Sequence, residues 1–245
     1  MSTEPAFPNS EPETRKPFGW QFWLILAVFI VVLAGLTQPM VIRSHKNVPK
    51  TEAISNLRQI GLAMFEFETE YGSFPNDTTA AEVTKNHPTH GYDLSGTSSN
   101  AMFRQLFAAQ ITQSEQMFYA KVPGVHKPDG NIFPGHALEK GEVAFGCVSV
   151  ISTTGNPARI VAFAPIISGT TKFDPKPFEG FAVVARIDNS VTSYKIQEDG
   201  SIGDKDGDIL SPAHPVWGEE EVPEFHYPDL DPTPSPGFFK RLFSK

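Results

Sequence analysis

The sequence is poor in cysteine, with Cys147 as the single one among 245 residues. A disulfide framework and a thiolate zinc site both need several cysteines, so neither can form within one chain. Cys147 stands in the apolar run Val143 to Ile151, where a cysteine usually behaves as a small buried hydrophobe. We therefore expect an inert thiol, which says nothing about the redox compartment.

Positive charge is also scarce. The chain has 20 Lys and Arg against 28 Asp and Glu, which gives a formal net charge of -8 at pH 7. A nucleic-acid-binding domain needs a basic surface that neutralises phosphates, whereas acidic clusters such as Glu219 to Glu221 repel a phosphate backbone. The composition therefore predicts no nucleic-acid partner.

The usual motifs of nucleophilic and phosphate chemistry are absent. The sequence contains no Gly-x-Ser-x-Gly elbow and no glycine-rich phosphate loop. His87 and His90 flank a Pro-Thr pair, which indicates a loop rather than a helical zinc pair. Carboxylates are abundant, but no sequence pattern pairs them, and a pair brought together by folding stays open. We expect a protein that is not an enzyme and has no cofactor.

One acidic turn has part of a calcium-binding pattern. Asp204, Asp206 and Asp208 alternate with other residues, as the first ligands of a calcium loop do. Such a loop has glycine at its sixth position and glutamate at its twelfth, where this chain has Ile209 and Pro215. The sequence therefore predicts no metal site and leaves these three aspartates as its calcium candidates, against an acidic solvated turn.

The strongest positive signal is a long hydrophobic run from Trp20 to Ile42, in which residues 22–36 include no polar side chain. This run predicts a transmembrane helix at residues 18–42, because about 20 apolar residues cross a hydrocarbon core. A cleaved signal peptide is the alternative, but the run is longer than a typical signal and no small-x-small site follows directly. Lys and Arg on both sides leave the orientation undecided by charge.

Polar, proline-rich segments lie at the two ends of the chain. Residues 1–17 show no apolar periodicity, which predicts a disordered cytoplasmic tail. Residues 211–245 are rich in proline, which predicts an irregular C-terminal tail. Between them, residues 43–210 are expected to form the folded domain.

Helical signals come first in this domain, and strand signals follow. Apolar residues at three- and four-residue steps from Ile54 to Tyr71 predict an amphipathic helix. A second helix is expected from about Asn100 to Gln110, with Ser99 as its N-cap. Apolar, β-branched runs predict four strands at residues 142–152, 159–168, 180–187 and 190–196, the last two joined by a tight turn at Asp188-Asn189. The domain is therefore α+β, with the amphipathic helix packed on a small antiparallel sheet.

The segment Ala53 to Pro75 resembles the helix that follows the membrane segment in bacterial type IV pilin-like and pseudopilin-like proteins. It contains their Asn-Leu-Arg-Gln-Ile-Gly-Leu-Ala run and their Tyr-Gly-x-Phe-Pro ending. The hairpin around Asp188-Asn189-Ser190-Val191 is similar to the closing strand pair of that family. The residues that carry the family motif are Asn56, Gln59, Gly61, Tyr71, Gly72 and Pro75.

This resemblance implies an anchored protein whose domain lies outside the cytoplasmic membrane and whose N-terminus lies inside. Gly19 resembles the processing glycine of prepilins, but Leu24 stands where the family has the glutamate used in filament packing. We therefore expect a single-pass protein of the inner membrane with a structural or interaction role. Its expected partners are the lipid bilayer and other pilin-like subunits. The alternatives are a processed minor pseudopilin of a type II secretion or type IV pilus machine, and an anchored ligand- or glycan-binding module that uses the loops at residues 77–100 and 129–136.

Overall fold

The computed structural model describes residues 19–149, 154–167, 169–218 and 222–232, and it describes the backbone alone for residues 34–47. The chain divides into two units, Met1–Lys46 and Asn47–Lys245. The predicted disordered tail at residues 1–17 and the last part of the predicted C-terminal tail, residues 233–245, lie outside the described residues.

The first unit contains the beginning of α1 (Trp20–Tyr71). Among the described residues, no helix combines the length and apolarity needed to cross a membrane. The prediction of an N-terminal transmembrane helix at residues 18–42 is therefore wrong.

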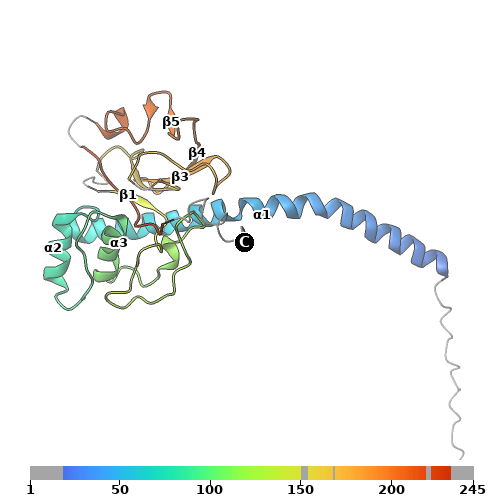
Figure 1. Ribbon diagram of the computed structural model, residues 1–245, viewed down its shortest axis with the longest axis horizontal. Helices are drawn as coiled ribbons and strands as arrows, with labels where there is room; N and C mark the ends of the chain where they lie inside the picture. Colours follow the sequence, from blue (N-terminus) through green and yellow to red (C-terminus); the bar gives the residue numbers. More distant parts are fainter. Residues whose placement is uncertain (1–18, 150–153, 168, 219–221, 233–245) are drawn as a thin grey trace, which may run out of the picture. The chain divides into compact units, whose positions relative to one another are not determined.

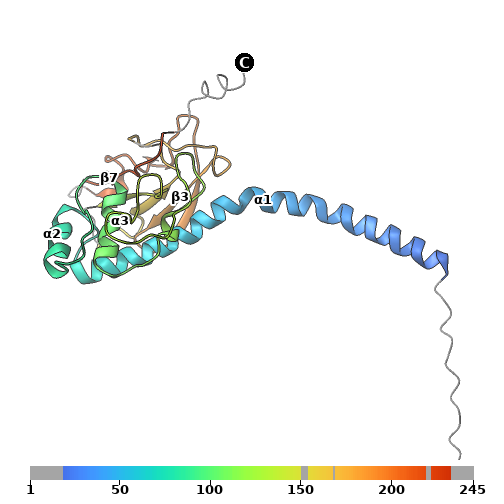
Figure 2. The ribbon, with the colours of Figure 1, turned by 60° about the horizontal axis from the view of Figure 1, so that its bottom comes forward.

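In the second unit, the remainder of α1 presents the expected apolar stripe to the core. Ala53, Leu57, Ile60, Met64 and Phe67 are at most 1% exposed, at three- and four-residue steps along one helix face. Figure 2 shows this part of α1 running beneath the sheet. The helix ends where Gly72 adopts a positive φ of 77°, the left-handed conformation that commonly terminates helices.

Two short helices lie near the C-terminal end of α1 (Figure 1). The first, α2 (Asp77–Asn86), was not expected; it begins with a capping box in which Asn76 accepts from the Thr78 and Thr79 amides. The second, α3 (Ser99–Ala108), matches the predicted helix, but its N-cap is Ser98 rather than Ser99. A short 3-10 turn, η1 (Gln116–Phe118), follows them.

A five-stranded antiparallel sheet forms the other layer, in the order β4-β3-β2-β1-β7. Its first four strands confirm the predicted ones, and the domain is α+β as expected. Asn189 occupies the hairpin turn with a φ of 59°, as an asparagine tolerates. The strands are β1 (Gly146–Ser149), β2 (Ile160–Ala164), β3 (Phe181–Arg186), β4 (Val191–Lys195) and β7 (Glu224–His226).

The segment after Asp199 contains more structure than its polar composition indicates. The ribbon β5 (Gly203–Asp204) and β6 (Gly207–Asp208) precedes the 3-10 turn η2 (Pro215–Trp217). β7 then pairs with β1 and closes one edge of the sheet. Residues 211–232 therefore contribute a buried turn and a strand to the domain, in the region for which the sequence predicted an irregular tail.

Candidate functional site

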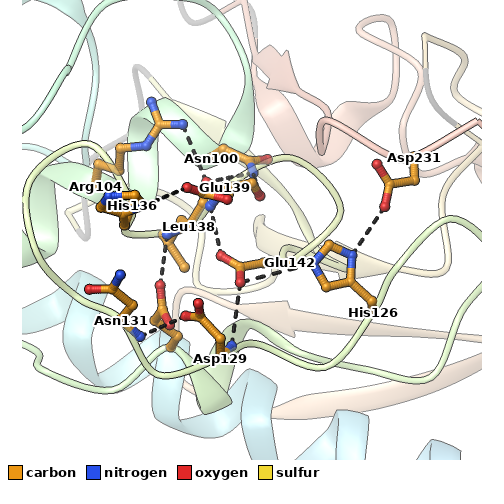
Figure 3. Close-up of polar contacts among 11 residues, drawn as sticks. Asn100, Arg104, His126, Asp129, Asn131, His136, Leu138, Glu139, Glu142 and Asp231 are labelled. Atoms are coloured by element: carbon orange, nitrogen blue, oxygen red, sulfur yellow. Dashed lines mark hydrogen bonds and ion pairs between the residues drawn. The ribbon is translucent and has the colours of Figure 1, made fainter.

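Three carboxylates from distant positions meet in the second unit. Glu115, Asp129 and Glu142 each offer one oxygen, and these oxygens lie within 4.8 Å of one another. Glu115 is 2% exposed and Glu142 is 3% exposed, whereas Asp129 is open to solvent. Figure 3 shows Asp129 and Glu142 pointing toward each other from separate segments. We refer to these three residues as the acidic cluster.

Each member of the acidic cluster comes from an irregular part of the chain. Glu115 immediately precedes η1, and Glu142 lies shortly before β1. Between η1 and β1, residues 119–145 form no helix or strand, and Asp129 lies within this segment. Ordered loops of more than about 12–15 residues without secondary structure are uncommon and often functional. The cluster therefore joins two points of one long ordered loop, Asp129 and Glu142, to the residue that precedes η1.

Backbone amides hold the carboxylates in place. Oε1 of Glu115 accepts from the Leu138 amide at 2.8 Å, and Oε2 of Glu142 accepts from the Glu139 amide at 2.7 Å. Oδ1 of Asp129 accepts from the Asn131 amide at 2.7 Å. These bonds fix the side chains before any ligand arrives, which lowers the entropy cost of binding.

A frame of polar contacts surrounds the acidic cluster (Figure 3). Asn100 donates to the carbonyls of Leu138 and Glu139 at 3.0 Å each, which ties the loop to α3. His126 lies 4.0 Å from Oε1 of Glu142 through Nε2, and its Nδ1 lies 3.1 Å from Asp231. No Lys or Arg forms an ion pair with the three carboxylates among the described residues. The cluster is thus strongly negative and faces a single histidine.

Burial raises the pKa of Glu115 above its ordinary value of 4.5, and the nearby charges of Glu142 and Asp129 raise it further. The amides of Leu138 and Gly130 oppose this shift, although only the Leu138 amide makes a hydrogen bond of normal geometry. The other oxygen, Oε2, is buried and has no hydrogen-bond partner among the described residues. A buried oxygen of this kind needs either a proton or a cation.

The acidic cluster offers oxygen ligands alone, which suit hard cations such as Ca²⁺. A hydrolytic role for the carboxylates requires a substrate between them, and two of the three are almost completely buried. The arrangement therefore favours binding of a small cation over acid-base catalysis.

The three calcium candidates of the sequence are arranged differently. Asp204 accepts from the Asp206 amide at 2.8 Å and lies 3.1 Å from Nε2 of His214. Asp208 accepts from the Leu210 amide and lies 3.7 Å from the ammonium of Lys172. Two of the three carboxylates thus have cationic or polar partners within the fold, and the described part of the chain does not bring the three together as a ligand cluster.

A serine–histidine pair that the sequence did not reveal joins β1 to β7. Oγ of Ser149 lies 2.6 Å from Nε2 of His226, and Nδ1 of His226 lies 2.9 Å from the carbonyl of Thr97. Because Ser149 is 0% exposed and His226 is 3% exposed, a substrate cannot reach the hydroxyl. We interpret the pair as a buried structural contact that holds the edge strand.

Cys147 lies in β1 and is 1% exposed. Burial raises the pKa of its thiol far above the usual value, so the nucleophilic thiolate is scarcely populated. This environment agrees with the inert thiol expected from the sequence.

The family-motif residues have structural roles in the domain. The amide nitrogen of Asn56 donates to the carbonyls of Gln116 and Tyr119, at 3.1 and 2.8 Å, whereas Gln59 is exposed. A Cβ at Gly61 would lie within 2.4 Å of Oδ1 of Asn189. Gly61 therefore lets α1 approach the tip of the β3–β4 hairpin, so the two segments that carry the resemblance contact each other.

The end of the motif shapes the end of α1. Tyr71 stacks on Phe67 with ring centroids 4.5 Å apart, and Gly72 supplies the left-handed turn. Pro75 is buried beyond it. Gly19 lies at the start of α1, where its carbonyl accepts from the Phe22 amide at 2.9 Å; processing after Gly19 stays a prediction.

The acidic cluster was missed because its members are separated by 14 and 13 residues and belong to no motif. One weak signal pointed toward it, because the loop at residues 129–136 was already a candidate binding loop. Only the folded loop brings the carboxylates together.

The comparisons with known proteins leave the resemblance as a prediction. No protein-family model, no curated protein and no solved structure matches this chain significantly.

Proposed function

We propose that the chain is a non-catalytic, pilin-like interaction protein of the cell envelope that assembles with other pilin-like subunits through the start of α1. The observation that carries this proposal is the apolar surface at Trp20 to Leu33. In the single chain, exposed side chains there include Trp20 at 72%, Ile25 at 70% and Val31 at 70%.

This surface extends around the helix. Exposed apolar side chains occur at consecutive positions from Phe22 to Ile25 and again from Val28 to Leu33. A helix that is hydrophobic on every side needs an apolar environment, because water leaves it without a stabilising core. Packing against similar helices of neighbouring subunits supplies that environment.

The second unit supports a role in interaction rather than catalysis. Its buried serine–histidine pair, Ser149 and His226, is closed to substrates, and its cysteine is buried. Its motif residues hold α1 against η1 and the β3–β4 hairpin. The unit thus has the features of a stable scaffold attached to an assembly helix.

The test is capture of partners by cross-linking the full-length chain in its native cells, followed by mass spectrometry. Leu24, Val28 and Val31 lie three and four positions apart, so they share one helix face. Changing all three to glutamine is expected to abolish recovery of pilin-like subunits, whereas Leu62→Gln, at an exposed apolar site later in α1, retains it. Equal recovery with the triple variant contradicts the proposal. Recovery of lipid vesicles without any pilin-like chain contradicts it as well.

A second candidate function, glycan or ligand binding, is favoured by a depression of about 370 Å³ between the loops predicted for that role. His90, Tyr92, Phe107, Ile132 and Pro134 are among its lining residues, and the rings of His90 and Tyr92 stack. Aromatic rings present flat apolar faces to ligands. A saccharide array probed with the full-length chain is expected to show binding that His90→Ala weakens; an array without signal removes this candidate.

A further inference from the structure

The acidic cluster concentrates negative charge in a place with little compensation. Glu115, Asp129 and Glu142 present three carboxylate oxygens within 4.8 Å, and two of the side chains are buried. Like charges at this separation repel strongly when solvent is excluded. His126 is the nearest basic group in the described contacts, and its Nδ1 is already 3.1 Å from Asp231. The folded loop therefore has to take up a proton or a cation.

We propose that Glu115, Asp129 and Glu142 form a calcium site that cross-links and stabilises the long loop between η1 and β1. Calcium binds oxygen at ~2.3–2.6 Å, so oxygens on opposite sides of the ion lie up to ~5 Å apart. The three oxygens, which all lie within 4.8 Å of one another, fit that range. Three protein carboxylates also suit calcium better than magnesium, because magnesium usually keeps several waters and binds one or two carboxylates.

An independent observation at Glu115 also points to a ligand. Its Oε2 atom is buried without a hydrogen-bond partner among the described residues, although Oε1 accepts from the Leu138 amide. Leaving a buried acceptor unpaired is costly in free energy. A cation bound between the three carboxylates gives this oxygen the partner that the polypeptide does not provide.

The position of the cluster explains what calcium does for the fold. Glu115 lies beside η1, whose Gln116 carbonyl is bonded to Asn56 of α1. Glu142 leads directly into β1, and Asp129 holds the middle of the loop. A single ion therefore connects the helix layer, the loop and the sheet, which stabilises the folded state by mass action.

The experiment is calorimetric titration of the full-length chain with CaCl₂, paired with thermal unfolding in calcium and in EDTA. Wild type is expected to bind one calcium ion more tightly than magnesium, and to unfold at a higher temperature with calcium. Glu115→Gln and Asp129→Asn are expected to weaken calcium binding at least about tenfold. The control Asp206→Asn, in the other acidic turn, is expected to bind as wild type does.

Folding and binding are separated by the behaviour of Glu115→Gln in EDTA. Glutamine keeps the size of the side chain but removes its charge, so this variant is expected to be at least as stable as wild type in EDTA above neutral pH. It then lacks the stabilisation by calcium while remaining folded. The proposal is overturned if wild type binds no calcium at ~10 mM, about ten times the Kd of the weakest extracellular modules. It is overturned equally if Asp206→Asn loses binding and Glu115→Gln retains it.

Discussion

Replacing Trp217 with alanine is expected to destabilise the second unit by about 3–5 kcal/mol, the usual cost of removing a buried tryptophan. Trp217 is fully buried, and its indole donates to the carbonyl of Ile209 at 3.1 Å. The ring of Trp217 packs edge-on against Phe225 of β7, with the ring centroids 5.8 Å apart. The substitution leaves a cavity, an unpaired carbonyl and a poorly supported edge strand, which together are a large part of the stability of an ordinary domain.

Urea unfolding followed by far-UV circular dichroism measures this loss. Val222→Ala is the control, because Val222 lies in the same C-terminal segment but is 75% exposed; its effect is expected to stay within about 0.5 kcal/mol. Equal midpoints for the two variants count against a structural contribution from residues 211–232. The result therefore distinguishes an integral C-terminal segment from an irregular tail.

Replacing Asn56 with alanine is expected to cost about 2–4 kcal/mol, because the carbonyls of Gln116 and Tyr119, both in part-buried hydrogen bonds, lose the shared donor. These two bonds connect α1 to η1 over about 60 residues of sequence. Asn56→Asp, which keeps the shape but removes the donor, is expected to destabilise at least as much. The loss is measured by chemical denaturation in EDTA, so that calcium does not contribute.

Gln59 is the matched control for Asn56. It belongs to the same family motif but is exposed, and its contact with Asn56 is long, at 3.5 Å. Gln59→Ala is therefore expected to change stability by less than about 0.5 kcal/mol. If both alanine variants lose similar stability, the motif does not act through the Asn56 bonds.

The local patterns of the sequence predicted the elements that depend on periodicity. The stripe from Ile54 to Tyr71 gave the amphipathic part of α1 because three- and four-residue steps place side chains on one face. The apolar runs before Asp199 gave four strands, and Asp188-Asn189 gave their tight turn. These features are local, so composition and spacing are sufficient to reveal them.

Features that depend on distant contacts were missed. β7 is three residues long and exists because it pairs with β1, and α2 depends on a cap from Asn76 in a segment that looks like a loop. The apolar run at Trp20 was predicted to span a membrane, but among the described residues no helix is long and apolar enough to cross one. The acidic cluster forms only because an irregular loop brings Glu115, Asp129 and Glu142 together. An irregular loop has no periodic sequence pattern from which this contact can be predicted.

The most direct test of the central claim about the site is a crystal structure of the full-length chain grown with calcium, with anomalous scattering data. If the three carboxylates bind calcium, an anomalous peak is expected among the oxygens of Glu115, Asp129 and Glu142, at ~2.3–2.6 Å from each carboxylate. An empty cluster in the presence of calcium, or a peak at Asp204 and Asp208 instead, contradicts it.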